Sequence, residues 1–493
     1  MLTSAWKSWG ACCFGLATLS LAAPGLAPGL EVAHNSGSGA RANATTTPKP
    51  RMIAMTDVVG SDVEPDDMQS LVHLLSVGDM FQIDGIVAVT GWNLDGRTEM
   101  YRIFDVIDAY EKDLPNLMKR SGQTEFLDDE VNQVIGYWPS AAYLRDVVAE
   151  GQTTRGMGGV GDGKATNGSR LVTSVIDRDD PYERPVWISF WGSGNTLAQS
   201  LWDVQKTRLT EEVDTFLSRV RVYTVTDQDR PFYPENDYTD VPITAQTWMR
   251  KTFGSKLFYI WSETAWRYLG LQTRDRWPQY QTGVQGKGAL GSIYPDYKYV
   301  VEGDTSSWVY AWPGVSDPED PSQWGFGGRF VDMLSPDNNT RAYMDLGDNE
   351  TTKCKEAISR SVQDQTNNFV SRIEWAATGS GNRNPVVVVN GDSSYQIVVM
   401  QAAPGAEMRI SAVGTADPDG DALSYAWTQD TGVRGAGWVD SVILDGPSTQ
   451  QDVSFTVPEG AAGRDIHFVL RVVDDGVPAL ATWRRVIVRV VAS

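Results

Sequence analysis

Alternation of strand-like and helical segments is the feature that most constrains this chain. From about residue 51 to residue 378, short apolar runs alternate with stretches whose apolar residues recur at helical spacing. The run Met52–Val58 is followed by a helical pattern from Asp66, and Ile83–Thr90 by another from Arg97. Such alternation indicates βαβ units. We therefore expect an α/β domain over residues 51–378, with an open, mostly parallel sheet and helices on both faces.

Four further strands and a closing helix are expected later in this domain. The strands are Val186–Trp191, Arg219–Thr226, Lys256–Trp261 and Tyr297–Glu302, and the helix is Lys353–Trp375. The segment 379–385 (GSGNRNP) has the composition of a linker.

The pattern changes at residue 386. Short β-rich runs are separated by Gly, Pro and Asp turns up to residue 493. This rhythm predicts a small all-β, immunoglobulin-like sandwich of ~100 residues. In one of its turns, Asp417, Asp419 and Asp421 alternate around Gly420. These acids either hold a Ca²⁺ ion or accept hydrogen bonds from the backbone of the turn.

The N-terminus has the layout of a secretory signal peptide. Lys7 precedes an apolar run, and the small residues Ser20 and Ala22 suit the −3 and −1 positions of a cleavage point. We expect a signal peptide over residues 1–22, a flexible leader over residues 23–50, and a secreted, extracellular protein. No later stretch reaches ~18 uninterrupted apolar residues, so we expect no membrane anchor.

The chain is strongly acidic. Its 63 Asp and Glu residues outnumber its 42 Lys and Arg residues, which gives a formal net charge of −21. Such a charge disfavours nucleic acid and anionic membranes as partners. It suits neutral ligands and hard cations. The 18 tryptophans indicate either a large core or flat surfaces that stack on sugar rings.

The densest group of acids follows the first expected strand, in the turn TDVVGSDVEPDD. Its acids are Asp57, Asp62, Glu64, Asp66 and Asp67. Carboxylates so close together repel each other unless they share a cation. Because all the donors are oxygens, Ca²⁺ is favoured over Mg²⁺, and Zn²⁺ is disfavoured. Capping of the following helix would account for one or two of these acids but not for five.

Polar and aromatic residues also follow the other expected strands. Trp92 and Asn93 follow the second strand, and Trp191 ends a later strand just before a glycine-rich turn with Asn195. Further along are Asp227, Asp229 and Asp304. In an open parallel sheet, ligands bind beyond the carboxyl ends of the strands, so a ligand site is expected there. Trp92 and Trp191 would stack on a sugar ring, with core packing as the alternative.

Six motifs together carry a family resemblance over residues 51–330. They are EPDDMQSLVHLL, FQIDGIVAVT, FWGSGNTLAQSLWDV, RVYTVTDQD, LGSIYPDYKYVVEGDTSSW and WGFGGRF. The acidic turn and the Gly-Asn-Thr-Leu-Ala turn resemble nucleoside hydrolases. The whole set is more similar to the cellulose-binding, nucleoside-hydrolase-like family, in which an immunoglobulin-like C-terminal domain is usual.

The resemblance implies a calcium site and an aspartate base. The metal ligands would be Asp66, Asp67, Asp304 and a carbonyl near Asn195, and the base would act on a water bound to the metal. Asp62 lies four residues before Asp66, which is the spacing of true nucleoside hydrolases. Asp57 lies nine residues before Asp66, where the related family usually has six. Either Asp57 or Asp62 could therefore be the base.

A general acid is harder to find. Many nucleoside hydrolases protonate the departing base with a histidine, but this chain has only His34, His73 and His467. His73 lies well inside the helix after the acidic turn, where we expect it to be a core residue. A carboxylic acid with a raised pKa could instead serve in O-glycosidic cleavage. The candidates are Glu64, Glu302, Asp227 and Asp229.

The sequence therefore favours a secreted, calcium-dependent hydrolase of glycosyl bonds. Its substrate would be a polysaccharide or oligosaccharide, cellulose among the candidates, with Asn93, Asp227 and Glu302 among the substrate-binding residues. Two alternatives remain open. One is a polysaccharide-binding protein without turnover, and the other is a secreted nucleoside hydrolase.

Overall fold

The computed structural model describes residues 47–231, 243–337 and 340–492. The expected signal peptide and nearly all of the expected leader lie outside these residues. Within the described ranges, no helix combines the length and the apolar character needed to cross a membrane.

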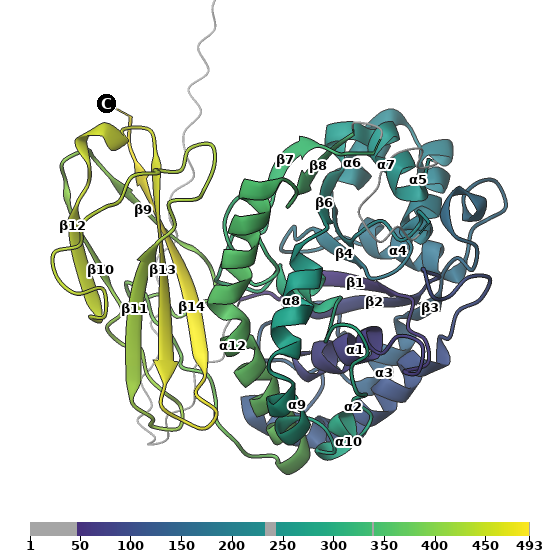
Figure 1. Cartoon of the computed structure of the whole chain (residues 1–493), viewed down its shortest axis with the longest axis horizontal. Helices are drawn as coiled ribbons and strands as arrows, with labels where there is room; N and C mark the ends of the chain where they lie inside the picture. Colours follow the sequence, from purple (N-terminus) through teal and green to yellow (C-terminus); the bar gives the residue numbers. More distant parts are fainter. Residues whose placement is uncertain (1–46, 232–242, 338–339, 493) are drawn as a thin grey trace, which may run out of the picture. The chain divides into compact units, whose positions relative to one another are not determined.

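An eight-stranded sheet forms the centre of the larger domain (Figure 1). Its order is β3-β2-β1-β4-β5-β6-β8-β7, and every neighbouring pair is parallel except β7 with β8. The strands are β1 (Arg51–Thr56), β2 (Gln82–Ala88), β3 (Val148–Glu150), β4 (Val186–Phe190), β5 (Val220–Val225), β6 (Phe258–Ser262), β7 (Val331–Leu334) and β8 (Arg341–Met344). This arrangement confirms the expected mostly parallel sheet.

Helices cover both faces of the sheet, because the strands present buried apolar side chains on both faces, as β1 does. Successive side chains of a strand point to opposite faces. Met52 and Ala54 accordingly join one buried cluster, and Ile53 and Met55 join the other. The first cluster includes residues of α1 (Asp66–Ser76), α2 (Tyr101–Ser121), α3 (Ala141–Asp146), α8 (Ala265–Arg274), α9 (Trp277–Gly283), α10 (Gly288–Ser292), α11 (Thr305–Val309) and α12 (Asp348–Thr378). The second includes residues of α4 (Asn167–Asp177), α5 (Asn195–Thr207), α6 (Thr210–Ser218) and α7 (Ala245–Phe253).

The expected strand at Tyr297–Glu302 is wrong, because this segment is a loop. Backbone groups at the two ends of this loop form hydrogen bonds with a side chain of α1 and not with a neighbouring strand. The Gln69 amide donates to the Pro295 carbonyl at 3.1 Å and accepts from the Glu302 N–H at 2.9 Å. The loop therefore lies on the same helix that begins with Asp66.

The C-terminal domain is built from two sheets, as expected for a sandwich. Four strands form a sheet in the order β11-β13-β14-β9, and β10 pairs with β12. The strands are β9 (Val398–Ala402), β10 (Glu407–Ser411), β11 (Leu423–Gln429), β12 (Asp452–Thr456), β13 (Asp465–Asp474) and β14 (Ala481–Val490). Their inward residues, such as Phe455 and Phe468, form a separate buried core.

The aspartates of one sandwich turn hold its backbone. The Asp417 carboxylate accepts from the N–H groups of Asp419 at 2.7 Å and Asp421 at 3.1 Å. The Asp419 carboxylate pairs with Arg383 at 2.6 Å. These contacts are the ones that the turn interpretation predicts.

A buried arginine joins the sandwich to the segment after α11. Arg485 of β14 donates to the carbonyls of Val315 at 2.9 Å and Trp324 at 3.1 Å. It also pairs with Asp430 at 3.0 Å. A buried guanidinium is tolerated only when such partners satisfy it, so these contacts specify how the segment packs.

Candidate functional site

The loops after β1, β2 and β4 meet around one carboxylate, that of Asp57. Asp57 follows β1 directly, whereas Gly91 and Gly192 follow β2 and β4. A Cβ atom on Gly91 would lie 1.6 Å from Asp57 Oδ2, and one on Gly192 would lie 2.6 Å from Asp57 Oδ1. Because no larger side chain leaves room for the carboxylate, both glycines are required for this close approach.

The Asp57 carboxylate is buried and has no hydrogen-bond partner among the described residues. The residue is only 1% exposed, and both Oδ1 and Oδ2 lack a partner. Burial raises the pKa of Asp57 well above its ordinary value, and the nearby Glu64 and Asp66 raise it further. Buried polar groups are nearly always paired in folded proteins. An unpaired carboxylate therefore marks a place where a ligand would bind.

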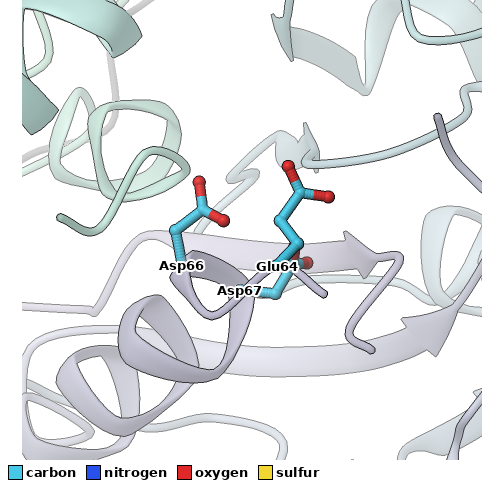
Figure 2. A group of neighbouring side chains, drawn as sticks. All are labelled: Glu64, Asp66 and Asp67. Carbon is cyan, nitrogen blue, oxygen red and sulfur yellow. The ribbon is translucent and has the colours of Figure 1, made fainter. Parts of the chain in front are cut away.

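Three more carboxylates form a cluster at the start of α1. One oxygen from each of Glu64, Asp66 and Asp67 lies within 4.8 Å of the others. Figure 2 shows the Glu64 and Asp66 carboxylates pointing to the same side, next to the first turn of the helix. The Asp67 carboxylate accepts from the Thr56 hydroxyl, and the Glu64 carboxylate accepts from the Asn93 amide. The cluster is thus supported by β1 and by the loop after β2.

Asp304 belongs to the same group, although it lies far along the chain. It immediately precedes α11, and its Oδ2 atom is buried without a partner in the part of the chain that the structure describes. Burial raises the pKa of Asp304 well above its ordinary value, and the negative charges of Asp67, Asp66 and Asp57 raise it further. A Cβ atom on Gly303 would lie 2.5 Å from Asp66 Oδ2, so this loop packs directly against the acidic turn.

Asn195 begins α5 at the same edge of the sheet. Its amide donates to the Thr154 carbonyl at 2.6 Å, while its Oδ1 atom is buried and finds no partner within the described ranges. Asp229 stabilises the glycine-rich turn that precedes Asn195. Its carboxylate accepts from the Gly194 N–H at 3.2 Å and also from the Gly156 N–H at 3.0 Å. Asp229 is therefore a supporting residue of the turn.

Asp62 is separate from this group. It is exposed on the surface of the acidic turn, and the Lys298 ammonium donates to its backbone carbonyl at 2.9 Å and to that of Val63 at 3.0 Å. Of the two aspartates considered as the base, Asp57 is the one in close contact with the glycines of the neighbouring loops.

Asp227 and Glu302 make hydrogen bonds within the fold rather than presenting free oxygens. Asp227 accepts from the Thr244 hydroxyl at 2.6 Å and from the Asp229 N–H at 3.1 Å. Burial raises the pKa of Asp227 to about 7. Glu302 is buried between His73 Nδ1 at 2.9 Å and the Tyr294 hydroxyl at 2.8 Å. These contacts argue against the predicted role of both acids in substrate binding.

Trp191 is a core residue, which corrects the prediction that it stacks on a ligand. Its side chain is 0% exposed, and its indole N–H donates to the Ser307 hydroxyl at 2.9 Å. Trp92 is partly exposed beside the exposed Asn93, and its indole N–H donates to the Arg230 carbonyl at 2.8 Å. His73 is buried and stacks on a phenylalanine ring, as expected for a core residue.

Gln228 also belongs to this site, although it was not among the predicted site residues. Its Oε1 atom accepts from the Trp92 N–H at 3.2 Å and would lie 2.9 Å from a Cβ atom on Gly91. Its amide also donates to the Trp191 carbonyl. Gln228 therefore ties the loops after β2, β4 and β5 together. The signal in the sequence is the position of Gln228 between Asp227 and Asp229, directly after β5.

Comparisons with known proteins place these features in a family. Residues 51–330 match the model described as "cellulose-binding Sde182, nucleoside hydrolase-like domain", and residues 407–490 match "cellulose-binding protein Sde0182, C-terminal domain". A solved structure from Saccharophagus degradans is 32% identical, with a TM-score of 0.76. The alignment covers 90% of this chain and 100% of that protein, which is described as nucleoside hydrolase-related and associated with carbohydrate metabolism. No curated protein shows a significant match.

Proposed function

Because the chain belongs to the cellulose-binding, nucleoside-hydrolase-like family, we propose that it is a secreted, calcium-dependent hydrolase of glycosyl bonds in a neutral polysaccharide or oligosaccharide. The observation that carries this proposal is the buried Asp57 carboxylate, which has no partner among the described residues and lies beside a cluster of acids. A surface that only bound sugar would not need such a group. The association of the related solved structure with carbohydrate metabolism supports the substrate class.

The residues present fit calcium. Ca²⁺ takes six to eight oxygen ligands, many of them carboxylates and carbonyls. Asp66, Asp67 and Asp304 would supply carboxylate oxygens, and Asp304 Oδ2 has no other partner among the described residues. A carbonyl near Asn195 would be a fourth protein ligand, and water or substrate oxygens would fill the remaining positions. When bound, the ion would hold these acids in their charged form and polarise an oxygen of water or substrate.

The roles of the acids follow from their surroundings. Asp57 would accept a proton from the attacking water, since both of its carboxylate oxygens lack a partner among the described residues. Glu64 would donate a proton to the departing sugar oxygen. It is partly exposed, whereas Glu302, Asp227 and Asp229 are buried and bonded within the fold. Asn93, which donates to Glu64, would orient it.

A nucleoside substrate is less well supported. His73 packs against Phe369 at a ring distance of 4.0 Å, and His467 lies in β13 of the sandwich. Neither histidine is available at the acidic turn to protonate a departing base. An O-glycoside can instead be cleaved by a pair of carboxyl groups.

The test is the release of reducing sugars from a panel of neutral plant and fungal polysaccharides, with and without a calcium chelator. Asp57→Asn should lower the rate by ~10²–10⁴ while sugar affinity and calcium content are retained. Asp62→Asn is the matched control, because it makes the same change in the same turn on an exposed residue, and it should retain activity. If the wild-type protein binds glucans but releases no sugar from any of them, the family's cellulose-binding role without turnover replaces this proposal.

A further inference from the structure

Two exposed tyrosines lie close to the acidic turn. Tyr297 is 36% exposed and Tyr299 is 60% exposed, both in the loop between α10 and α11. Lys298 lies between them and reaches the acidic turn, with its Nζ atom 2.9 Å from the Asp62 carbonyl. The same atom is 5.3 Å from the centre of the Tyr299 ring. The Tyr299 ring is therefore adjacent to the turn that carries Glu64, Asp66 and Asp67.

The loop that carries these rings is held at its base. Gln69 of α1 bonds to the backbone at both Pro295 and Glu302, and the Tyr294 hydroxyl donates to Glu302 at 2.8 Å. Trp277 of α9 is half-buried and meets the Tyr297 ring edge-on at a centroid distance of 4.9 Å. Both ends of the loop are thus held in place before any ligand arrives, which lowers the entropic cost of binding.

Packing does not explain why these rings are exposed. Among the ring contacts of the described residues, Tyr297 meets Trp277 edge-on, and Tyr299 contacts only the Lys298 ammonium. That ammonium is already engaged by the carbonyls of Asp62 and Val63, so it offers little to an anionic ligand. The neighbouring carboxylates would repel phosphates and uronic acids. A flat, uncharged ring with polar edges is the chemistry that fits this surface.

We propose that Tyr297 and Tyr299 form a stacking platform for the pyranose rings of a neutral glucan. The platform would hold sugar units beyond those at Asp57, so that a longer chain binds more tightly than a short one. This inference rests on the proposed function for its ligand class, but it does not need turnover.

The test is equilibrium binding of cellobiose and cellohexaose to the full chain carrying Asp57→Asn, so that the ligand is not consumed. Tyr297→Ala and Tyr299→Ala should each weaken cellohexaose binding by roughly 10-fold, by analogy with stacking on bases. Cellobiose binding should change less. Tyr299→Phe keeps the ring and should restore the affinity.

Tyr182→Ala is the matched control. Tyr182 is 45% exposed and has a cation, Arg184, 5.1 Å from its ring centre, much as Tyr299 has Lys298. It precedes β4 and so lies toward the opposite edge of the sheet, where its loss should leave binding unchanged.

Three results would overturn the platform. They are unchanged binding in both Tyr297→Ala and Tyr299→Ala, an equal loss in Tyr182→Ala, and no binding of any neutral glucan by the parent protein. Sugar release by the wild-type chain is measured separately. A protein that binds through these tyrosines but releases no sugar refutes only the hydrolase proposal, and one that cleaves glucans with unaffected tyrosine variants refutes only the platform.

Discussion

Replacing Gly91 by alanine should displace the Asp57 carboxylate without unfolding the protein. The new Cβ atom would lie 1.6 Å from Asp57 Oδ2 and 2.4 Å from its Cγ atom, distances that no real Cβ atom tolerates. The other close atom is Gln228 Oε1 at 2.9 Å. Since all three atoms belong to side chains, the backbone can stay in place while Asp57 rotates away. The fold should therefore persist while the carboxylate loses its position.

The size of the effect follows from the role proposed for Asp57. Loss of a general base lowers a rate by ~10²–10⁴, which corresponds to about 3–5 kcal/mol in the activation barrier. Gly91→Ala should therefore lose about as much activity as Asp57→Asn in the reducing-sugar assay. Its melting temperature should change little. Gly460→Ala in the sandwich is the control, because its new Cβ atom would meet only a tryptophan edge at 3.5 Å.

A double-mutant cycle makes this prediction specific to Asp57. If Gly91→Ala acts only by displacing that carboxylate, it should have no further effect in a chain that already carries Asp57→Ala. Two outcomes would refute the reasoning. One is full activity in Gly91→Ala, and the other is an activity loss that adds to the loss caused by Asp57→Ala.

Three further predictions concern the metal, the tryptophans and pH. Metal analysis should find about one calcium per chain in the wild type and none in Asp67→Ala. If calcium was present at 100-fold its Kd, its removal by a chelator should lower the free energy of unfolding by ~3 kcal/mol. Zinc in the site, or no metal in the wild type, would contradict this prediction. Trp191→Ala should lower the free energy of unfolding in urea by ~3–5 kcal/mol, because the Trp191 side chain is in the core. Trp92→Ala should mainly weaken sugar binding. Equal shifts of the melting temperature in both variants would contradict this difference between the two tryptophans. Burial raises the pKa of Asp227 from 3.8 to about 7, so its contribution to stability is complete below pH ~4 and is lost as the pH rises through 7. Asp227→Asn should therefore flatten the profile of stability against pH in this range. An unchanged profile would show that Asp227 is ionised in the native protein.

Local patterns predicted the fold class of the larger domain, although β3, β7 and β8 were not predicted and the expected strand Tyr297–Glu302 is a loop. The run Met52–Met55 is apolar at every position because β1 is buried on both faces, and this is the signature of a central parallel strand. The acids between Asp57 and Asp67 also predicted a ligand site from local information, because the repulsion between their carboxylates depends only on their spacing in the turn. The position of that site at the carboxyl ends of the strands follows from the parallel topology.

Tertiary structure alone decided which of these residues meet. Asp57 and Asp62 have the same chemistry and lie five residues apart, yet only Asp57 contacts the glycines of the neighbouring loops. Trp191 and Trp92 both lie at strand ends, but Trp191 turns into the core, where Ser307 accepts its indole N–H. The pairing of Glu302 with His73 spans 229 residues. Burial and partners of this kind are set by contacts between segments far apart in the chain, and no local pattern of residues encodes them.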